Sequence, residues 1–305
     1  GCQMFSVVIP LYNKRNHIEK AVESVLGQEF GDYEVIIVDD GSTDGSQDIV
    51  DGMEHSKLKI IHQENRGVAE ARNTGIRNAV NDYICFLDAD DKWLPNHLSE
   101  IKKLIEKYPM AGLYSTIPKI ILKDGSSIVN TDRNLPELVH DYLGYICGHK
   151  MFIHTNSVCV KRNVFDEVGY FTSGEKLSED ISMWHRIALC HDIAIRQIVT
   201  NEYHRENSQV SENACYNESW KFPEIAEELV RGHPIEKSKI ESLEKYLARY
   251  STGVCIQQCR NGNKKAAIRT FNSIDRSKVQ LERRVKMVLC LACPKILLAA
   301  LPKRK

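Results

Sequence analysis

The sequence lacks an excess of charge of either sign, because 41 Lys and Arg residues balance 41 Asp and Glu residues. Proteins that bind nucleic acid through a basic surface usually carry a positive balance, so we expect no nucleic acid partner. The ten cysteines are scattered, and the single C-x-x-C motif, Cys290 and Cys293, has no second pair to complete a zinc site. Cys85 and Cys159 lie within apolar runs, which favours buried thiols in a reducing compartment over a disulfide framework.

Glycine-rich phosphate loops are also missing. No G-x-G-x-x-G motif follows the first apolar segment, which argues against a dinucleotide-dependent dehydrogenase. The equivalent loop, residues 11–15, is Leu-Tyr-Asn-Lys-Arg and lacks the glycines typical of a nucleotidyltransferase that makes sugar nucleotides. The apolar run at residues 285–301 is interrupted by lysines and a proline and is too short to predict a membrane span. No signal peptide precedes Phe5, so we expect a cytoplasmic location.

Apolar runs alternate with amphipathic stretches over the first part of the chain. Strands are expected at residues 5–10, 33–38, 58–62 and 83–87. Helices are expected between them, at residues 14–26, after Gly45 up to residue 53, and at residues 67–80. This alternation is typical of a mostly parallel sheet with helices on both faces, so we predict an α/β fold of Rossmann-like type.

The following segments continue this α/β domain. Helices are expected at residues 93–108, at 161–168 and from residue 178. Strands are expected at residues 113–122, 127–129, 156–160 and 193–199, with a tight hairpin turn at 123–126. From about residue 220 the pattern is helical without further strands. We therefore predict two domains, an α/β domain of residues 1–215 and a helical C-terminal extension of residues 216–305.

Three carboxylates, Asp88, Asp90 and Asp91, follow the apolar run Tyr83-Ile-Cys-Phe-Leu87 within four residues. Carboxylates this close repel one another, so an ordered arrangement needs positive charge between them. The simplest candidate is Mg²⁺ or Mn²⁺, held by one or two carboxylates and the oxygens of a diphosphate. The alternative is a solvated acidic turn. The position at the carboxyl end of a buried strand, where open α/β sheets bind ligands, favours the metal.

Five short motifs occur in a fixed order, each at a strand end or helix start: residues 8–13, 38–44, 65–73, 87–91 and 178–180. Together they resemble the family 2 glycosyltransferases with the GT-A fold, of the bacterial cell-surface polysaccharide type, over about residues 5–211. The resemblance implies an inverting, metal-dependent enzyme. It would move a single sugar from a nucleotide-sugar donor, with a UDP-sugar favoured, to a hydroxyl of a saccharide or a lipid-linked saccharide.

The resemblance also implies a donor-nucleotide site made of Pro10, Tyr12, Asn13, Asp40, Arg72 and Asp88. Tyr12 offers a flat face to the base, beside the backbone of Pro10. The resemblance assigns to Asp40 a hydrogen bond from a ring N–H of uracil or guanine, while Asp39 is a candidate cap of the following helix. Arg72 could reach the base or a phosphate with its fork of donors.

For the metal, the resemblance implies Asp90 as a direct ligand, with Asp88 meeting the ribose or the metal's water shell. His204 resembles the late histidine that contacts metal or diphosphate in GT-A enzymes, although a lone histidine is more often structural. Arg205 beside it could reach a phosphate. We interpret Asp91 as a cap for the helix expected from Trp93.

A second acidic pair, Glu179-Asp180, stands at an expected helix start, where capping is the ordinary role of such residues. Inversion requires one carboxylate to take the proton of the acceptor hydroxyl. By resemblance Asp180 is this base, and Glu179 helps to place the acceptor. Processive synthases of the family carry Q-x-x-R-W after the acidic pair, whereas residues 184–188 here are Trp-His-Arg-Ile-Ala. This difference favours addition of a single sugar.

The C-terminal segment leaves two interpretations open. From Arg276 onward the chain is basic and apolar, which suits a helix in the interface of the inner face of the cytoplasmic membrane. A helix packed on the protein with a solvated basic tail is the alternative. For the whole chain, a sugar-nucleotide nucleotidyltransferase and a non-catalytic nucleotide-binding scaffold are the rival functions. The presence of Asp88, Asp90 and Asp180 together argues against the scaffold.

Overall fold

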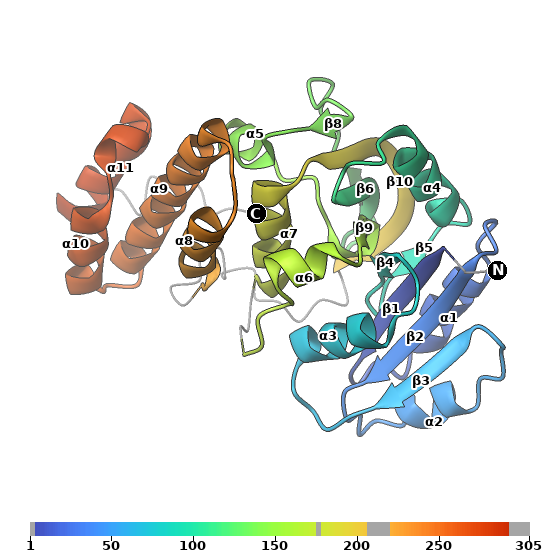
Figure 1. Ribbon diagram of the computed structural model, residues 1–305. Coiled ribbons are helices and arrows are strands. Elements are labelled where there is room, and N and C mark those ends of the chain that lie inside the picture. Colours follow the sequence, from blue (N-terminus) through green and yellow to red (C-terminus); the bar gives the residue numbers. More distant parts are fainter. Residues whose placement is uncertain (1–3, 175–177, 206–219, 293–305) are drawn as a thin grey trace. The chain divides into compact units, whose positions relative to one another are not determined.

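The computed structural model describes residues 4–174, 178–205 and 220–292 (Figure 1). The chain forms two compact units, Gly1–Tyr142 with Met151–Val210, and Leu143–Lys150 with Ser211–Lys305. The domain boundary expected near residue 215 falls between the described ranges.

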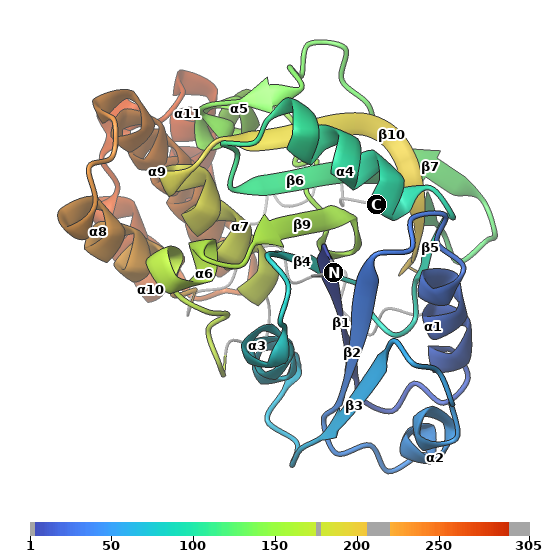
Figure 2. The same cartoon turned by 45° about the vertical axis from the view of Figure 1, so that its right-hand side comes forward.

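One mixed sheet of ten strands organises the described part of the first unit. The strand order is β3-β2-β1-β4-β9-β6-β10-β5, with β7 beside β6 (Figure 2). The short strand β8 pairs with β10. The strands are β1 Phe5–Leu11, β2 Tyr33–Asp39, β3 Leu58–His62, β4 Tyr83–Phe86, β5 Lys92–Trp93, β6 Leu113–Ile121, β7 Ser127–Val129, β8 Leu138–Val139, β9 Val158–Lys161 and β10 Ile193–His204. The predicted α/β class is confirmed.

Helices cover both faces of the parallel half of the sheet, β3-β2-β1-β4. Val7 and Ile9 of β1 pack in one core with α1 and α4, while Val8 points to the other face, against Gly75 of α3. This alternation is the ordinary consequence of the two-residue period of a strand. The helices of the first unit are α1 Ile18–Leu26, α2 Ser46–Asp51, α3 Val68–Asn78, α4 His97–Lys107, the 3₁₀ turn η1 Thr155–Ser157, α6 Val164–Val168 and α7 Glu179–Cys190.

The other half of the sheet is mixed. Strand β9 runs antiparallel to both β4 and β6, and β10 runs parallel to β6. The hairpin expected at residues 113–129 is present as the antiparallel pair β6–β7. Strand β10 continues five residues beyond its expected end at residue 199, and this extension brings His204 to the acidic turn after β4.

The helix expected from Trp93 is wrong over its first turn. Lys92 and Trp93 instead form the short strand β5, paired antiparallel with β10, and α4 begins only at His97. Pro95 explains the difference, because the residue before a proline is disfavoured in the helical region. The Trp93 ring is buried, and its Nε1 donates to the carbonyl of Asn156 at 2.8 Å.

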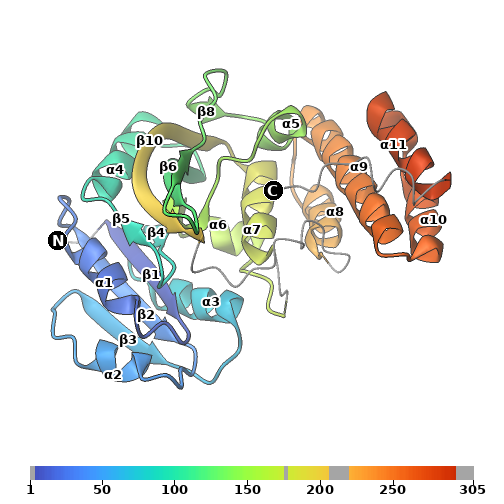
Figure 3. The same ribbon diagram turned by 180° about the vertical axis from the view of Figure 1, so that it is seen from behind.

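The described part of the second unit is helical (Figure 3). Its core contains Cys255, Met287 and Cys290, so Cys290 is a buried apolar residue, as expected; Cys293 lies outside the described residues. Among the described helices none has the length and apolarity needed to span a bilayer. The helices are α5 Tyr142–Gly148, α8 Phe222–Gly232, α9 Lys237–Arg260, α10 Lys264–Ser273, the 3₁₀ turn η3 Arg276–Lys278 and α11 Leu281–Ala292.

Candidate active site

A cleft of about 390 Å³ lies at the carboxyl ends of β1, β2 and β4. These ends meet because the strands are parallel neighbours in register, and the backbone N–H of Asp40 donates to the carbonyl of Leu11 at 2.8 Å. Six of the residues predicted from the sequence line this cleft: Pro10, Tyr12, Asp40, Arg72, Asp88 and Asp90. Lys14 also lines it, although the sequence did not single it out, and so does Asn65, which belongs to the third motif but was given no role.

The loop after β1 presents Tyr12 and ties itself to the loop after β2. The Tyr12 side chain is 48% exposed, so its ring face is accessible from the cleft. Asn13 has a φ of 52°, a left-handed conformation that asparagine tolerates better than most residues. Its Oδ1 accepts from the backbone N–H of Thr43 at 2.8 Å, and its own N–H donates to Oγ of Ser42 at 3.0 Å. Asn13 therefore holds the two loops together.

Asp40 is buried and joins β2 to the start of α3. Its Oδ1 accepts from Nε2 of Gln63 at 2.7 Å and from the backbone N–H of Arg66 at 2.9 Å. Its Oδ2 accepts from the backbone N–H of Gly67 at 2.8 Å. A ring N–H of a bound nucleotide base would therefore share the Asp40 oxygens with these three donors.

Asp39 caps no helix, contrary to one interpretation of the sequence. Its Oδ1 accepts from the backbone N–H of Ser42 at 3.1 Å, and its Oδ2 lies 3.1 Å from Nδ1 of His62. Helix α2 begins only at Ser46, after Gly45. The Asp39 carboxylate thus stabilises the turn itself. This contact raises the pKa of His62, although burial opposes the shift.

Arg72 connects the acidic turn to the start of α7. Its Nη2 lies 2.9 Å from Oδ1 of Asp88, and its Nη1 lies 2.9 Å from Oε1 of Glu179. Burial opposes the charge of Arg72, but Asp88, Glu179 and Asp180 outweigh this effect and raise its pKa. Arg72 was expected to reach a base or a phosphate. Instead, both of its terminal nitrogens pair with carboxylates of the protein.

The acidic turn has cations of the protein beside it. Nζ of Lys14 lies 2.5 Å from Oδ2 of Asp90, and Arg72 pairs with Asp88. Both carboxylates line the cleft, and carboxylate oxygens are the donors that Mg²⁺ and Mn²⁺ prefer. In the described ranges no three His, Cys, Asp or Glu side chains converge to hold a metal. The residues fit a cation that takes one or two protein carboxylates and completes its shell with diphosphate and water.

Asp91 is not the cap of α4, and this interpretation is wrong. Its Oδ2 accepts from Nδ2 of Asn156 at 2.5 Å, and its Oδ1 accepts from the backbone N–H of His204 at 2.6 Å. Burial, reinforced by Asp88 and Asp90, raises the pKa of Asp91 to about 8. Asp91 thus fastens the acidic turn to the end of β10. It cannot cap α4, because that helix begins six residues later, at His97.

Asn156 holds the acidic turn at two points. Besides its bond to Asp91, its Oδ1 accepts from the backbone N–H of Asp88 at 2.7 Å. The preceding residue, Thr155, donates its Oγ1 hydrogen to Oδ2 of Asp180 at 2.9 Å. The turn η1 therefore contacts both acidic motifs. Sequence reasoning missed it, because residues 156–160 were assigned to a strand, which begins only at Val158.

Glu179 and Asp180 form the first turn of α7. Oδ1 of Asp180 accepts from the backbone N–H of Ile181 at 2.7 Å, so part of the carboxylate serves the helix start. Burial raises the pKa of Glu179, while Arg72 opposes this shift and Asp180 adds to it. Burial also lowers the pKa of His154, with Asp180 opposing, which favours a neutral imidazole near the acidic pair. His154 was not among the predicted site residues.

His204 closes β10 beside the acidic turn. Its backbone N–H is bound to Asp91, and its Nε2 lies 3.6 Å from Oε2 of Glu202. Arg205 follows as an exposed residue at the end of the described range. The structure thus brings the backbone of His204 to Asp91 of the acidic turn.

Comparison with known proteins decides the family. The model of the family "Glycosyl transferase family 2" matches residues 6–173, more than half of the chain. The chain belongs to glycosyl transferase family 2. The matched range contains the cleft, the acidic turn and η1, whereas α7 and the C-terminal helices lie beyond it.

Curated relatives support membership in glycosyl transferase family 2. Glycosyltransferase GlyG of Streptococcus pneumoniae is 28% identical over 61% of this chain and 65% of its own. The amylovoran biosynthesis glycosyltransferase AmsB of Erwinia amylovora is 34% identical over 54% of this chain and 58% of its own. An uncharacterized glycosyltransferase of Rickettsia felis is 28% identical over 67% of this chain and 35% of its own. The chain therefore matches between about a third and two thirds of these relatives' lengths.

Solved structures show the same fold. S. aureus TarS superposes with a TM-score of 0.68 at 18% identity, covering 95% of this chain and 53% of TarS. A shorter TarS chain, residues 1–349 in complex with UDP-GlcNAc, gives a TM-score of 0.65 over 94% of this chain. At this identity the likeness establishes the GT-A type of architecture for this member of glycosyl transferase family 2.

Proposed function

We propose that this protein is a metal-dependent, inverting glycosyltransferase that moves one sugar from a UDP-sugar to a hydroxyl of a saccharide or lipid-linked saccharide. One observation carries the proposal. Through its ion pairs to Asp88 and Glu179, Arg72 joins the acidic turn and the Glu179-Asp180 pair at one buried guanidinium. Donor and acceptor groups would then meet at one point. The UDP-GlcNAc and UDP complexes of TarS and the polysaccharide role of AmsB support this choice of substrates.

The donor nucleotide would lie along the loops after β1 and β2. The exposed Tyr12 ring offers its face to the base beside the backbone of Pro10, and Asn13 fixes the loop that presents them. Asp40 would accept from the ring N–H of uracil through a lone pair not used by Gln63, Arg66 or Gly67. Asp88, which is partly exposed, would meet the ribose.

The metal, Mn²⁺ or Mg²⁺, would be held by Asp90 with Asp88 beside it, and His204, whose backbone N–H is bound to Asp91 of the same turn, would approach the diphosphate. When bound, the ion supplies positive charge for the departing diphosphate. The Lys14 ammonium pairs with Asp90, the proposed metal ligand. When the metal occupies Asp90, this ammonium would turn to a phosphate oxygen. Arg205 offers a further positive charge at the end of β10.

Asp180 would act as the general base. Its carboxylate takes the proton of the acceptor hydroxyl while that oxygen attacks C1 of the donor sugar. The C1–O bond to the diphosphate breaks on the opposite face, which inverts the anomeric centre. Thr155 and the N–H of Ile181 orient the two oxygens of Asp180, and each oxygen keeps a lone pair for the proton. Glu179, fixed by Arg72, would help to place the acceptor.

A donor assay tests this proposal. Wild-type protein with Mn²⁺ is expected to bind UDP more tightly than GDP or ADP in calorimetric titrations, and to release UDP from a UDP-sugar. EDTA should abolish release, and added Mn²⁺ or Mg²⁺ should restore it. Release that is undiminished in EDTA would contradict the metal, and tighter binding of GDP would contradict the uridine donor. Production of UDP-sugar from UTP and a sugar 1-phosphate would show a nucleotidyltransferase instead.

We also infer a contact of α11 with the inner face of an anionic membrane. Leu281, Val285 and Leu289 recur at a spacing of four residues on α11, and all three side chains are exposed. Arg283, Arg284 and Lys286 lie on the same helix. An apolar stripe with neighbouring cations is typical of helices that lie in the membrane interface.

Liposome sedimentation tests the membrane contact. Truncation at Lys286 would be uninformative, because Met287 and Cys290 of the same helix are buried in the core of the second unit. Substitution of Leu281, Val285 and Leu289 by serine changes only exposed positions. We expect the wild-type protein to sediment with anionic liposomes and the triple variant to stay in solution, with UDP binding equal in both. Absence of wild-type binding would leave α11 as a packing helix.

A further inference from the structure

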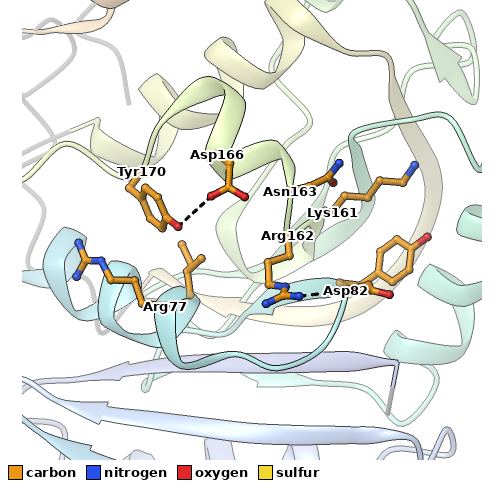
Figure 4. A pocket seen from close by; sticks show the side chains of 9 residues that line it. Arg77, Asp82, Lys161, Arg162, Asn163, Asp166 and Tyr170 are labelled. Atoms are coloured by element: carbon orange, nitrogen blue, oxygen red, sulfur yellow. Dashed lines mark hydrogen bonds and ion pairs between the residues drawn. The ribbon is translucent and has the colours of Figure 1, made fainter. Parts of the chain in front are cut away.

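A second cavity, of about 490 Å³, shares no lining residue with the active-site cleft. Figure 4 shows the side chains that line it. The last residues of α3, the start of β4, and the segment from the end of β9 to Tyr170 surround it. Helix α3 contributes to both places. Its first turn lines the cleft, and Ile76 and Arg77 near its other end line this cavity. Asp82 precedes β4 and Asp88 follows it, so the cavity and the acidic turn lie at opposite ends of this strand, and a ligand here would not touch the reacting atoms.

Two arginine side chains, Arg77 and Arg162, line this cavity. Nη2 of Arg162 lies 3.9 Å from Oδ1 of Asp82, and the Asp82 side chain is 86% exposed. An exposed pair of this kind contributes little stability, and Nη1 of Arg162 donates to the carbonyl of Ala79 only over a long 3.5 Å, so a ligand can take over the Arg162 donors at small cost. Arg77 uses Nη1 for Glu70, at 2.8 Å, and its guanidinium lies 5.5 Å from the ring centre of Tyr170. Its other nitrogens are left for a ligand.

Acceptors for hydroxyl groups stand opposite these cations. The Asp166 carboxylate points toward the hydroxyl of Tyr170, which donates to it over a long 3.4 Å (Figure 4). Such a weak bond is readily exchanged for one to a ligand. Burial and Asp166 raise the pKa of Tyr170, while the positive charges of Arg77 and Arg162 oppose this rise. Both arginines therefore act electrostatically on the same phenol. Cations, carboxylate and phenol therefore converge on one space.

The balance of charges limits the ligand. Arg77, Lys161 and Arg162 bring three positive charges, and Asp82 and Asp166 bring two negative ones. The two carboxylates would repel a compact multivalent anion. A neutral ligand would leave the guanidinium groups without an anionic partner. A ligand with one anionic group and several hydroxyls satisfies both sets. The cavity volume lies within the range of small-molecule sites.

We propose that this cavity binds an anionic saccharide, a sugar unit with a carboxylate or phosphate group among its hydroxyls. Arg77 and Arg162 bind the anionic group, and Asp82 and Asp166 accept from hydroxyls. Because the cavity is remote from the reaction, it holds a part of the acceptor or product chain several sugars from the growing end. The acceptor role rests on the proposed glycosyl transfer, whereas the binding itself does not.

Direct binding tests the cavity independently of catalysis. The probes are a galacturonate tetrasaccharide, maltotetraose as a neutral tetrasaccharide, glucose 6-phosphate and inorganic phosphate. We expect the wild-type protein to bind the uronate tetrasaccharide or glucose 6-phosphate at least tenfold more tightly than maltotetraose. The better of the two identifies the anionic group as carboxylate or phosphate. Inorganic phosphate that binds as tightly as these would show a plain anion site and overturn the proposal.

Variants locate the binding. The pair Arg77→Gln and Arg162→Gln should weaken binding at least tenfold, and the single change Arg162→Glu should do so without touching the Arg77–Glu70 pair. Lys123→Gln with Arg133→Gln, at exposed positions of the same unit, is the matched control and should bind as wild type. Unchanged binding in the arginine variants, or none in the wild type, overturns the proposal. UDP titrations on the same samples test the proposed function separately, because these arginines lie outside the donor cleft.

Discussion

Nζ of Lys14 lies 2.5 Å from Oδ2 of Asp90, so the loop after β1 supplies a positive charge to the acidic turn after β4. Both side chains are largely removed from solvent, which strengthens the pair relative to one on the surface. A metal that binds Asp90 must compete with this ammonium. In the proposed function, metal binding would therefore be coupled to the position of Lys14, whose ammonium would turn toward the diphosphate.

The first prediction concerns this competition. Lys14→Met should tighten Mn²⁺ binding in the absence of nucleotide by about two- to tenfold, because the cost of displacing the ammonium disappears. Calorimetry with Mn²⁺ alone measures it, and Lys20→Met, an exposed change on α1, is the control. Asp90→Asn should abolish Mn²⁺ binding. Weaker binding by the Lys14 variant would show that Lys14 supports the metal site instead of competing for it.

The second prediction concerns the base. Asp180→Asn keeps the shape of the side chain but removes its basicity, so transfer should fall by about 10²- to 10⁴-fold while UDP binding persists. Asp32→Asn, at an exposed position, should keep the wild-type rate. NMR of the anomeric proton should show a β-linked product from an α-linked donor. A retained α configuration, or a normal rate in the Asp180 variant, would leave Asp180 as a residue of the helix start only.

The third prediction separates two neighbouring residues of η1. Asn156→Ala removes both side-chain bonds to the acidic turn, so Mn²⁺-dependent UDP binding should weaken at least tenfold. Thr155→Val removes only the bond to Asp180, so kcat should fall while UDP binding stays the same. Calorimetry and steady-state kinetics on the two variants give the comparison. Equal effects of the two substitutions on UDP binding would mean that η1 acts only through general stability, which the thermal midpoint would report.

The fourth prediction concerns the contact of α3 with the sheet. A Cβ on Gly75 would lie 2.3 Å from Cγ1 of Val8, a stiff and fully buried side chain. Gly75→Ala should therefore lower the free energy of unfolding by about 1–3 kcal/mol, the usual cost of overpacking. Gly31→Ala, where the new Cβ would contact no atom within 4 Å, is the control. Thermal unfolding of both variants measures this cost. A Gly75→Ala variant as stable as the control would show that α3 can move away from β1.

The fifth prediction concerns acid stability. Burial lowers the pKa of His97 and of His185 to about 3, whereas in the unfolded chain a histidine titrates near about 6.5. Between these values only the unfolded state takes up the protons, so stability falls as the pH drops below about 6.5. Each histidine contributes at most about 1.4 kcal/mol per pH unit. His97→Gln should flatten the dependence of the thermal midpoint on pH between pH 5 and 6.5.

The first four strands and the meeting of their ends were predictable from the sequence. Each apolar run has strand length, and the carboxyl ends of parallel neighbours share one edge of the sheet, so Tyr12, Asp40 and Asp88 had to lie close together. Five motifs in order were sufficient to predict the family, which the family match confirms. These inferences succeed because they depend on short segments and on the parallel pairing rule.

The contacts that shape the site depend on distant segments and could not be predicted in this way. Lys14 and Asp90 are 76 positions apart, and Asn156 and Asp91 are 65 apart. Asp91 was interpreted as a cap because its nearest neighbours suggested a helix. Its burial depends on β10 running on to His204, a pairing that no local pattern encodes. The antiparallel place of β9 between β4 and β6 is equally non-local.

The two ion pairs of Arg72 restrict how this protein can be redesigned. Asp88 belongs to the half of the α/β unit that would hold the donor, and Glu179 to the half that would receive the acceptor. A chimaera that imports α7 from a relative with another acceptor must also import a carboxylate facing Arg72, or a buried positive charge loses half of its compensation. The two halves are therefore not interchangeable modules, and a change of acceptor will require compensating changes at the guanidinium that they share.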